Sequence, residues 1–139
     1  HKVGRQVRVY RVLAMRQYTT SPMPRVISVH EYELCADADP EEFEAAVQDA
    51  REEGLLTLPG LENYHLLKGI KGARAHRYGA IWIYESRTAW ESLWGPPDAP
   101  IEKPDYPENW KTWEDEVLTP YLSEDPDAIR FTSYRELGA

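Results

Sequence analysis

Two strand-like segments near opposite ends of the chain constrain its fold more than any other feature. Residues 26–34 and residues 129–137 alternate in side-chain character and are rich in β-branched and aromatic residues, which is typical of β-strands. Two further segments of this kind, residues 61–69 and 78–85, lie between them. The sequence therefore predicts a sheet of four strands.

Two helical segments separate these strands. Asp39 and Pro40 supply an N-cap and a proline at the first helical position, and apolar residues follow at helical spacing as far as Glu53. A second helix, capped by Ser86, carries two tryptophans before a Gly-Pro-Pro sequence at residues 95–97 stops it. The order β-α-β-β-α-β predicts an α+β, ferredoxin-like antiparallel sheet with its helices on one face.

An inserted segment follows the second helix. Residues 95–106 contain four prolines and few apolar residues, which is typical of a loop. Pro107 then begins an extra helix. Its apolar face carries Trp110, Trp113, Val117, Leu118 and Tyr121. This helix is an addition to the minimal fold, and its aromatic face would suit a lid over a pocket.

Charge divides the 139 residues into two parts. Residues 1–22 hold five Lys and Arg and no acid, whereas residues 23–139 hold eleven Lys and Arg against 24 Asp and Glu, a formal charge of −13. We interpret residues 1–22 as a basic N-terminal extension, resembling a transit peptide in composition but poor in serine, and residues 23–139 as the folded domain. A domain this acidic repels phosphates and anionic lipids, so neither nucleic acid nor membrane is expected as a partner.

Location and metal chemistry are limited by features that the sequence lacks. It has no apolar run of the roughly 20 residues that a membrane span needs, and no recognisable signal peptide, so a cytoplasmic location is expected. The single cysteine, Cys35, excludes an internal disulfide and a cysteine-based zinc cluster. No metal-ligand spacing, phosphate loop or dinucleotide fingerprint occurs, so neither a metal nor a cofactor is expected.

Side chains alternate across each strand, so each strand presents two sets of residues. In the first and third strands one set is largely aliphatic, and the other mixes aromatic rings with polar groups. The first kind comprises Ile27, Val29, Glu31, Ile81 and Ile83; the second comprises Val26, Ser28, His30, Tyr32, Leu34, Tyr78, Ala80, Trp82 and Tyr84. We expect the aliphatic sets beneath the helices and the mixed sets on the open face, as a cavity wall or a subunit interface. The last strand can add either Arg130, Thr132 and Tyr134 or Phe131 and Ser133.

The order of elements and the sequence Ala-Ile-Trp-Ile-Tyr-Glu-Ser-Arg-Thr-Ala-Trp-Glu-Ser-Leu-Trp at residues 80–94 resemble the dimeric α/β-barrel superfamily, which includes the antibiotic biosynthesis monooxygenase-like proteins. The resemblance covers nearly all of residues 25–137. It implies that two ferredoxin-like subunits press their open sheet faces together into a barrel, with a small-molecule pocket in each subunit. The partner that it implies is therefore a second copy of the chain.

The chain departs from the monooxygenase pattern at three positions. Tyr84 stands where that pattern has a tryptophan, and Leu93 stands near its helix histidine. The haem-degrading members use an asparagine in the first strand, where this chain has Ser28 or His30. Because the helix histidine that would bind iron is absent, haem degradation is not expected.

His30 is the candidate catalytic residue. An imidazole in the middle of a strand and flanked by phenols can take a proton from an acidic phenol or β-keto carbon. The alternative is a histidine that is hydrogen-bonded at a dimer interface. The candidate substrate-binding residues are Tyr32, His65, Tyr78, Trp82, Tyr84 and Tyr134.

Three functions fit this pattern. The first is a homodimer that binds a small aromatic or polyketide-like molecule and acts on it by proton abstraction, as a cofactor-independent monooxygenase or a cyclase or isomerase. The second is a non-catalytic binding or stress-related protein of the same fold. The third is a barrel with a packed interior that acts through assembly alone.

Overall fold

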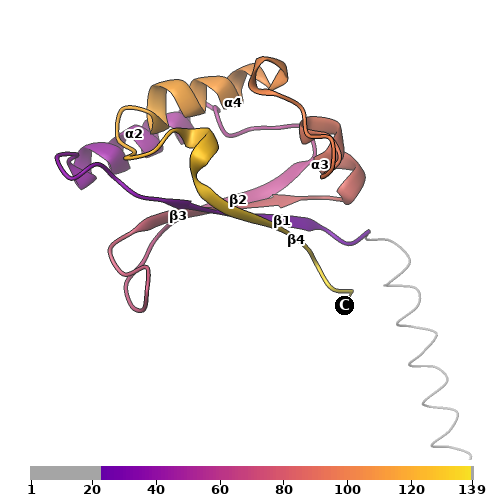
Figure 1. The fold of residues 1–139 in the computed structure, drawn as a ribbon, viewed down its shortest axis with the longest axis horizontal. Coiled ribbons are helices and arrows are strands. Elements are labelled where there is room, and N and C mark those ends of the chain that lie inside the picture. The colour runs from indigo at the N-terminus through magenta and orange to yellow at the C-terminus, as the bar shows by residue number, and fades with distance from the viewer. Residues whose placement is uncertain (1–22, 139) are drawn as a thin grey trace, which may run out of the picture.

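The computed structural model describes residues 23–138, and the basic extension predicted at residues 1–22 lies outside the described residues. Figure 1 shows a sheet with its helices on one side. The strands are β1 (Val26–Tyr32), β2 (Leu61–Lys68), β3 (Tyr78–Tyr84) and β4 (Arg130–Arg135). The helices are α2 (Pro40–Glu52), α3 (Arg87–Trp94) and α4 (Glu108–Thr112), which continues as the π-helix η2 (Trp113–Leu118); η1 (Lys103–Asp105) and η3 (Pro126–Ala128) are 3₁₀ turns. The predicted α+β, ferredoxin-like fold with an extra helix is confirmed.

The sheet has the strand order β2-β3-β1-β4, and its neighbouring strands are antiparallel. The central strand β1 places His30 opposite Ala80 of β3 on one side and Phe131 of β4 on the other. This register places the middle of β1 between the strand from the middle of the chain and the strand near its C-terminal end.

The helix starts and stops follow the local signals in the sequence. The Asp39 carboxylate accepts a hydrogen bond from the backbone N–H of Glu41 at 2.9 Å, and the Ser86 hydroxyl accepts one from Ala89 at 3.1 Å. Gly95 ends α3 with a φ of 80°, and a side chain there would meet the carbonyl oxygen of Ala99. The predicted caps are therefore confirmed.

The prediction of which sheet face lies beneath the helices is wrong. The mixed sets lie under the helices, where Tyr32 and Trp82 are buried, whereas Ile81 and Ile83 lie on the opposite, partly exposed face. The helices offer large aromatic side chains rather than aliphatic ones, and rings pack well against rings. Two hydroxyls on this face form a pair, because the Oγ atoms of Ser28 and Ser133 lie 2.7 Å apart.

Trp82 is the centre of the core. It is fully buried, and its ring centroid lies 5.0 Å from that of Trp110, 6.2 Å from that of Trp113 and 5.7 Å from that of Tyr64. Phe43 and Val47 of α2 are buried in the same core. The extra helix is thus part of the core, because its tryptophans cover the middle of the sheet.

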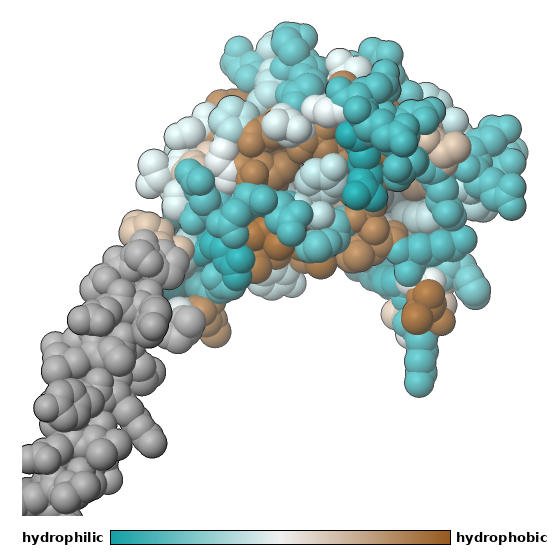
Figure 2. Space-filling view, turned by 180° about the vertical axis from the view of Figure 1, so that it is seen from behind, coloured by the Kyte–Doolittle hydropathy of each residue, from teal (hydrophilic) through white to brown (hydrophobic). Residues whose placement is uncertain are grey.

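The surface combines hydrophilic and apolar areas. Seen from behind, apolar side chains gather in the middle of the molecule, with hydrophilic ones above and below (Figure 2). Leu67 and Tyr134, both on strands, are 44% and 55% exposed, and Ile70 at the β2–β3 hairpin is 91% exposed. None of the helices within residues 23–138 has the length and apolar character needed to cross a membrane.

Replacing Trp82 with alanine should destabilise the fold strongly. A large buried side chain removed from a packed core leaves a cavity, and such Trp→Ala changes lower the free energy of unfolding by about 3–5 kcal/mol. Urea denaturation followed by far-ultraviolet circular dichroism measures this loss. The exposed Ile70→Ala variant is the matched control and should change the free energy of unfolding by less than about 0.5 kcal/mol.

Candidate functional site

A cavity of about 470 Å³ lies between the sheet and the helices. Strands β1 and β4 supply one wall through Ser28, His30, Phe131 and Ser133. The other walls come from α3, from the proline-containing loop that follows it, and from α4 and η2. Their contributions are Trp90, Trp94, Gly95, Pro96, Pro97, Pro100, Ile101, Tyr106, Trp110, Glu114 and Leu118. The inserted loop and helix therefore supply much of the cavity wall that faces the sheet.

His30 lies at the sheet wall within a group of aromatic rings. The centroid of its imidazole is 5.8 Å from that of Phe131, 5.9 Å from that of Trp82 and 6.1 Å from that of Trp110, all in edge-on arrangements. Burial among these rings disfavours the charged form and lowers the pKa of His30 to about 4. The imidazole is therefore neutral at pH 7 and has a nitrogen that can accept a proton.

Glu114 lies on the opposite wall and is the most unusual residue of the cavity. Its side chain is 6% exposed, and its Oε1 receives no hydrogen bond from any described residue, although the Nζ of Lys103 is 3.4 Å away. Burial and, after it, the nearby negative charge of Asp127 raise the pKa of Glu114 to about 7, while Lys103 acts in the other direction. This carboxyl group can therefore gain or lose a proton near neutral pH.

The helix that carries Glu114 is irregular at this position. The backbone N–H of Thr119 donates to the carbonyl oxygen of Glu114 at 2.9 Å, an i→i+5 bond, and the Thr119 hydroxyl donates to the same oxygen at 2.7 Å. Such π-type turns are rare, and they occur frequently at functional sites. The irregular turn and the buried carboxyl group coincide at one residue.

Tyr84 completes the polar lining near α3. Its hydroxyl accepts a hydrogen bond of 3.1 Å from the Nε1 of Trp94, and burial raises its pKa. The phenol stays protonated at neutral pH, so its own O–H is a donor. The cavity thus combines a neutral acceptor at His30, a titrating carboxyl group at Glu114 and a hydroxyl donor at Tyr84.

The residues predicted for the site lie in four places. His30 and Tyr84 line the cavity. Tyr32 and Trp82 share its face of the sheet but are buried in the core and do not line it. His65 and Tyr134 lie on the other face of the sheet, where they pair across strands with Ile81 and Ile27 respectively. Tyr78 lies at the far end of β3, where its hydroxyl donates to Glu44.

Glu114 is not among the residues predicted for the site, although the sequence contains a signal for it. Glu114 is four residues after Trp110 and four before Leu118, so it falls on the apolar face of the predicted helix. A carboxylate at such a position is buried on folding, and buried ionisable groups with shifted pKa values are candidates for function.

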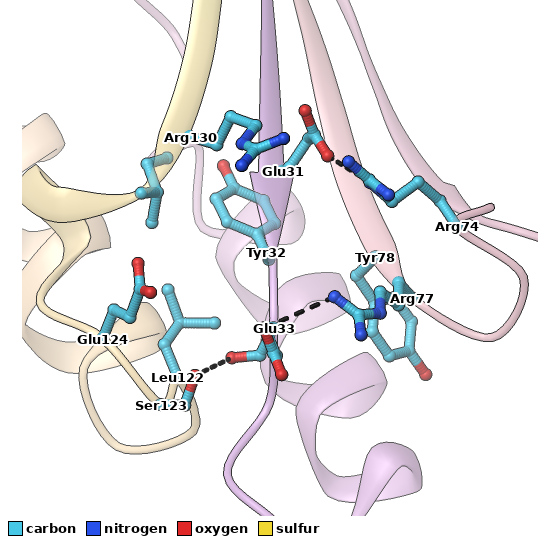
Figure 3. Close-up of a pocket in the computed structure, with 11 residues that line it drawn as sticks. Glu31, Tyr32, Glu33, Arg74, Arg77, Tyr78, Leu122, Ser123, Glu124 and Arg130 are labelled. Carbon is cyan, nitrogen blue, oxygen red and sulfur yellow. Dashed lines mark hydrogen bonds and ion pairs between the residues drawn. The ribbon is translucent and has the colours of Figure 1, made fainter.

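A second, more polar pocket of about 350 Å³ lies at the hairpin end of the sheet. Figure 3 shows its arginines directed at acidic side chains of β1 and of the segment that follows it. Arg74 pairs with Glu31, and the Nη1 of Arg77 lies 3.4 Å from the Oε2 of Glu33. Because these charges already pair with one another, this pocket is a weaker candidate for a ligand site than the aromatic cavity.

A metal centre has no obvious place in the described part of the chain. Within residues 23–138, no group of three or more His, Cys, Asp or Glu side chains converges closely enough to hold a metal ion.

Comparison with known proteins adds a fold relationship. No protein-family model and no curated protein matches the chain. Among solved structures it is similar to a dabb family protein with a ferredoxin-like fold from Mesorhizobium loti (14% identity, TM-score 0.54, covering 84% of this chain and 100% of that one). It is also similar to SnoaB, a cofactor-independent oxygenase from Streptomyces nogalater (13%, 0.51, 84% and 96%), and to a dimeric ferredoxin-like protein of unknown function from Thermobifida fusca (10%, 0.53, 81% and 92%).

These structural neighbours include dabb and antibiotic biosynthesis monooxygenase-like proteins, as the sequence pattern predicts. At such low identity the likeness shows the ferredoxin-like fold alone. The residues of the site must be judged on their own geometry.

The shifted pKa of Glu114 predicts a particular dependence of stability on pH. Because folding raises this pKa from 4.5 to about 7, the folded state holds the proton more tightly than the unfolded state. The stabilisation is present below pH 4.5 and is lost as the pH rises through about 7, which is ~3 kcal/mol for a shift of this size. Glu114→Gln removes the titration, so its free energy of unfolding should gain on that of the wild type between about pH 5 and pH 8.

Comparing the two proteins at each pH by urea denaturation cancels the opposite contribution of His30. The lowered pKa of His30 makes stability rise as the pH rises from about 4 to 6.5, and this happens in both proteins. If the two stability curves run parallel between about pH 5 and pH 8, the carboxyl group of Glu114 titrates as an ordinary exposed one.

Proposed function

We propose that the chain is a homodimeric protein whose helix-side cavity binds a small aromatic or polyketide-like molecule and moves a proton on it. The observation that carries this proposal is the placement of His30 and Glu114 on facing walls of one aromatic cavity, with pKa values shifted in opposite directions. Pairs of titratable groups whose environments move their pKa values apart are typical of acid–base sites.

The reaction class that suits these groups is proton abstraction from an acidic carbon. His30 is the neutral base that takes the proton from the substrate. The proton then passes to Glu114, because the ionised Glu114 carboxylate has the higher pKa and is the stronger base of the two. Tyr84 donates a hydrogen bond to the enolate oxygen. The enolate can then cyclise or isomerise, or react with dioxygen so that a CH₂ group and O₂ give a C=O group and water.

A non-catalytic binding protein is the second candidate. It is favoured by the pKa of about 4 at His30, which makes this imidazole a weak base. In that case the aromatic walls and Tyr84 hold a ligand that is not transformed. The cytoplasmic location and the absence of nucleic-acid partners, both expected from the sequence, remain predictions.

Replacing His30 with alanine should abolish turnover of an activated aromatic substrate. The probes are an anthrone (1,8-dihydroxy-9-anthrone) and a simple quinol, assayed by dioxygen uptake and by product absorbance. His65→Ala is the matched control, because His65 lies on the sheet face away from the cavity, and it should retain turnover. Light scattering on both variants checks that the dimer persists.

The wild type itself separates the two candidates. Trp90, Trp94 and Trp110 line the cavity, so a bound probe should quench tryptophan fluorescence. Quenching without turnover supports the binding protein, and turnover that survives in His30→Ala contradicts the acid–base role of His30.

The homodimer is proposed to form through the open face of the sheet. The neighbour from Thermobifida fusca is described as dimeric, and Ile27, Val29, Ile81 and Ile83 lie on the face of this sheet that the helices leave open. A sheet face rich in aliphatic side chains gains from being covered, because burial of apolar surface is favourable.

Light scattering should therefore find the wild type to be a dimer and Ile81→Glu to be a monomer, because the substitution would bury an unpaired charge at the interface. Ile70→Glu, at the exposed hairpin, makes the same chemical change elsewhere and should leave the dimer intact. A monomeric wild type would contradict this arrangement directly.

A further inference from the structure

The charges that face the helix-side cavity are of one sign. Glu114 and Asp127 line it, and none of its lining residues is a lysine or an arginine. His30, the remaining ionisable group of basic type, is neutral at pH 7 because burial lowers its pKa to about 4. At neutral and higher pH the cavity therefore presents negative charge to whatever enters it.

This negative charge is only partly compensated by the protein. The Nζ of Lys103 lies 3.4 Å from the Oε1 of Glu114, but it lies closer, at 2.7 Å, to the Oδ1 of the exposed Asp115. One ammonium group is thus shared between two carboxylates. The side chain of Glu114 is only 6% exposed, and its Oε1 still receives no hydrogen bond from any described residue.

The walls near these carboxylates are aromatic. Trp94 lies edge-on to Tyr106, with centroids 5.4 Å apart at 86°, and also edge-on to Trp110, at 5.4 Å and 65°. Trp90 and Phe131 line the same cavity. Rings set at steep angles present several π faces and edges to one space, and the faces of tryptophan and tyrosine attract cations.

We propose that this cavity selects an organic cation, a protonated amine or a quaternary ammonium carried on an apolar body, with its positive charge held between Glu114 and Asp127. The inference rests on the proposed function in one respect, that the cavity binds a small molecule. The apolar body packs against the tryptophans, and the cation supplies the hydrogen bond that the Oε1 of Glu114 does not receive from the described residues. A neutral ligand of the same shape leaves that carboxylate with only the shared charge of Lys103 to compensate it.

Two probes that differ in charge and little in shape test the proposal. They are 2-naphthylmethylamine, which is protonated at neutral pH, and 2-naphthylmethanol, which is neutral; binding to the full chain is measured by isothermal titration calorimetry. At about pH 8 the amine should bind about tenfold more tightly than the alcohol, as a desolvated cation–π contact and an ion pair would give. At about pH 6 the ratio should shrink, since the pKa of Glu114 is about 7 and its carboxylate becomes protonated.

Isosteric variants locate the effect. Glu114→Gln and Asp127→Asn should each reduce the preference for the amine while leaving the affinity for the alcohol unchanged, which also shows that the cavity remains folded. Glu116→Gln is the matched control, because Glu116 is exposed on the same helical segment and does not line the cavity. A loss of preference in Glu116→Gln would indicate a general effect of net charge and would overturn the proposal.

The outcomes also separate this proposal from the function on which it rests. Equal affinity for the two probes, or tighter binding of the alcohol, overturns cation selection and leaves a small-molecule cavity in place. Failure of both probes to bind at millimolar concentration overturns cation selection and the small-molecule cavity together.

Discussion

The packing of Trp82 beneath the inserted helix is the interaction on which the remaining structure depends. This fully buried ring belongs to β3, which lies between β2 and β1 in the sheet, and it packs against the tryptophans of α4 and η2. It holds the extra helix at a fixed distance above the sheet, and the proline-containing loop before that helix then closes one end of the intervening space. The cavity lies over Ser28 and Ser133, whose small side chains fill less space than the ring of Trp82 on the neighbouring strand.

Much of the fold could be predicted from the sequence, because its signals are local. The Asp39 and Ser86 caps, the glycine that ends α3 and the period-2 strands each depend on neighbouring residues alone. The orientation of the sheet is a different problem. Alternation defines two faces of a strand but does not say which one the helices cover, and here both faces are apolar enough for either place. The choice depends on the aromatic side chains of α4, which lie about thirty residues away in sequence from β3.

The site was predicted only in part for the same reason. His30 is predicted because it is a histidine in the middle of a strand. It lies in the cavity because it shares a face of β1 with Ser28 and Tyr32, and this face lies under the helices. Glu114 was passed over because a glutamate in a helix is ordinarily solvated, and its burial follows from the tryptophans around it. His65 pairs with Ile81 and Tyr134 pairs with Ile27, so both side chains lie on the sheet face away from His30. Only the pairing of the strands defines this, and the sequence does not specify the pairing.

The order of the two pKa values decides how the cavity can handle a proton. An exposed histidine is a stronger base than an exposed glutamate, but here burial reverses the order, with about 4 for His30 and about 7 for Glu114. A proton placed on His30 is therefore unstable there, and Glu114 is the favourable acceptor on the facing wall. Between these two values both groups are neutral, and above the higher one the cavity gains a buried negative charge. A cationic ligand and a departing proton thus compete for one carboxylate, so ligand binding and proton transfer in this cavity are linked through Glu114.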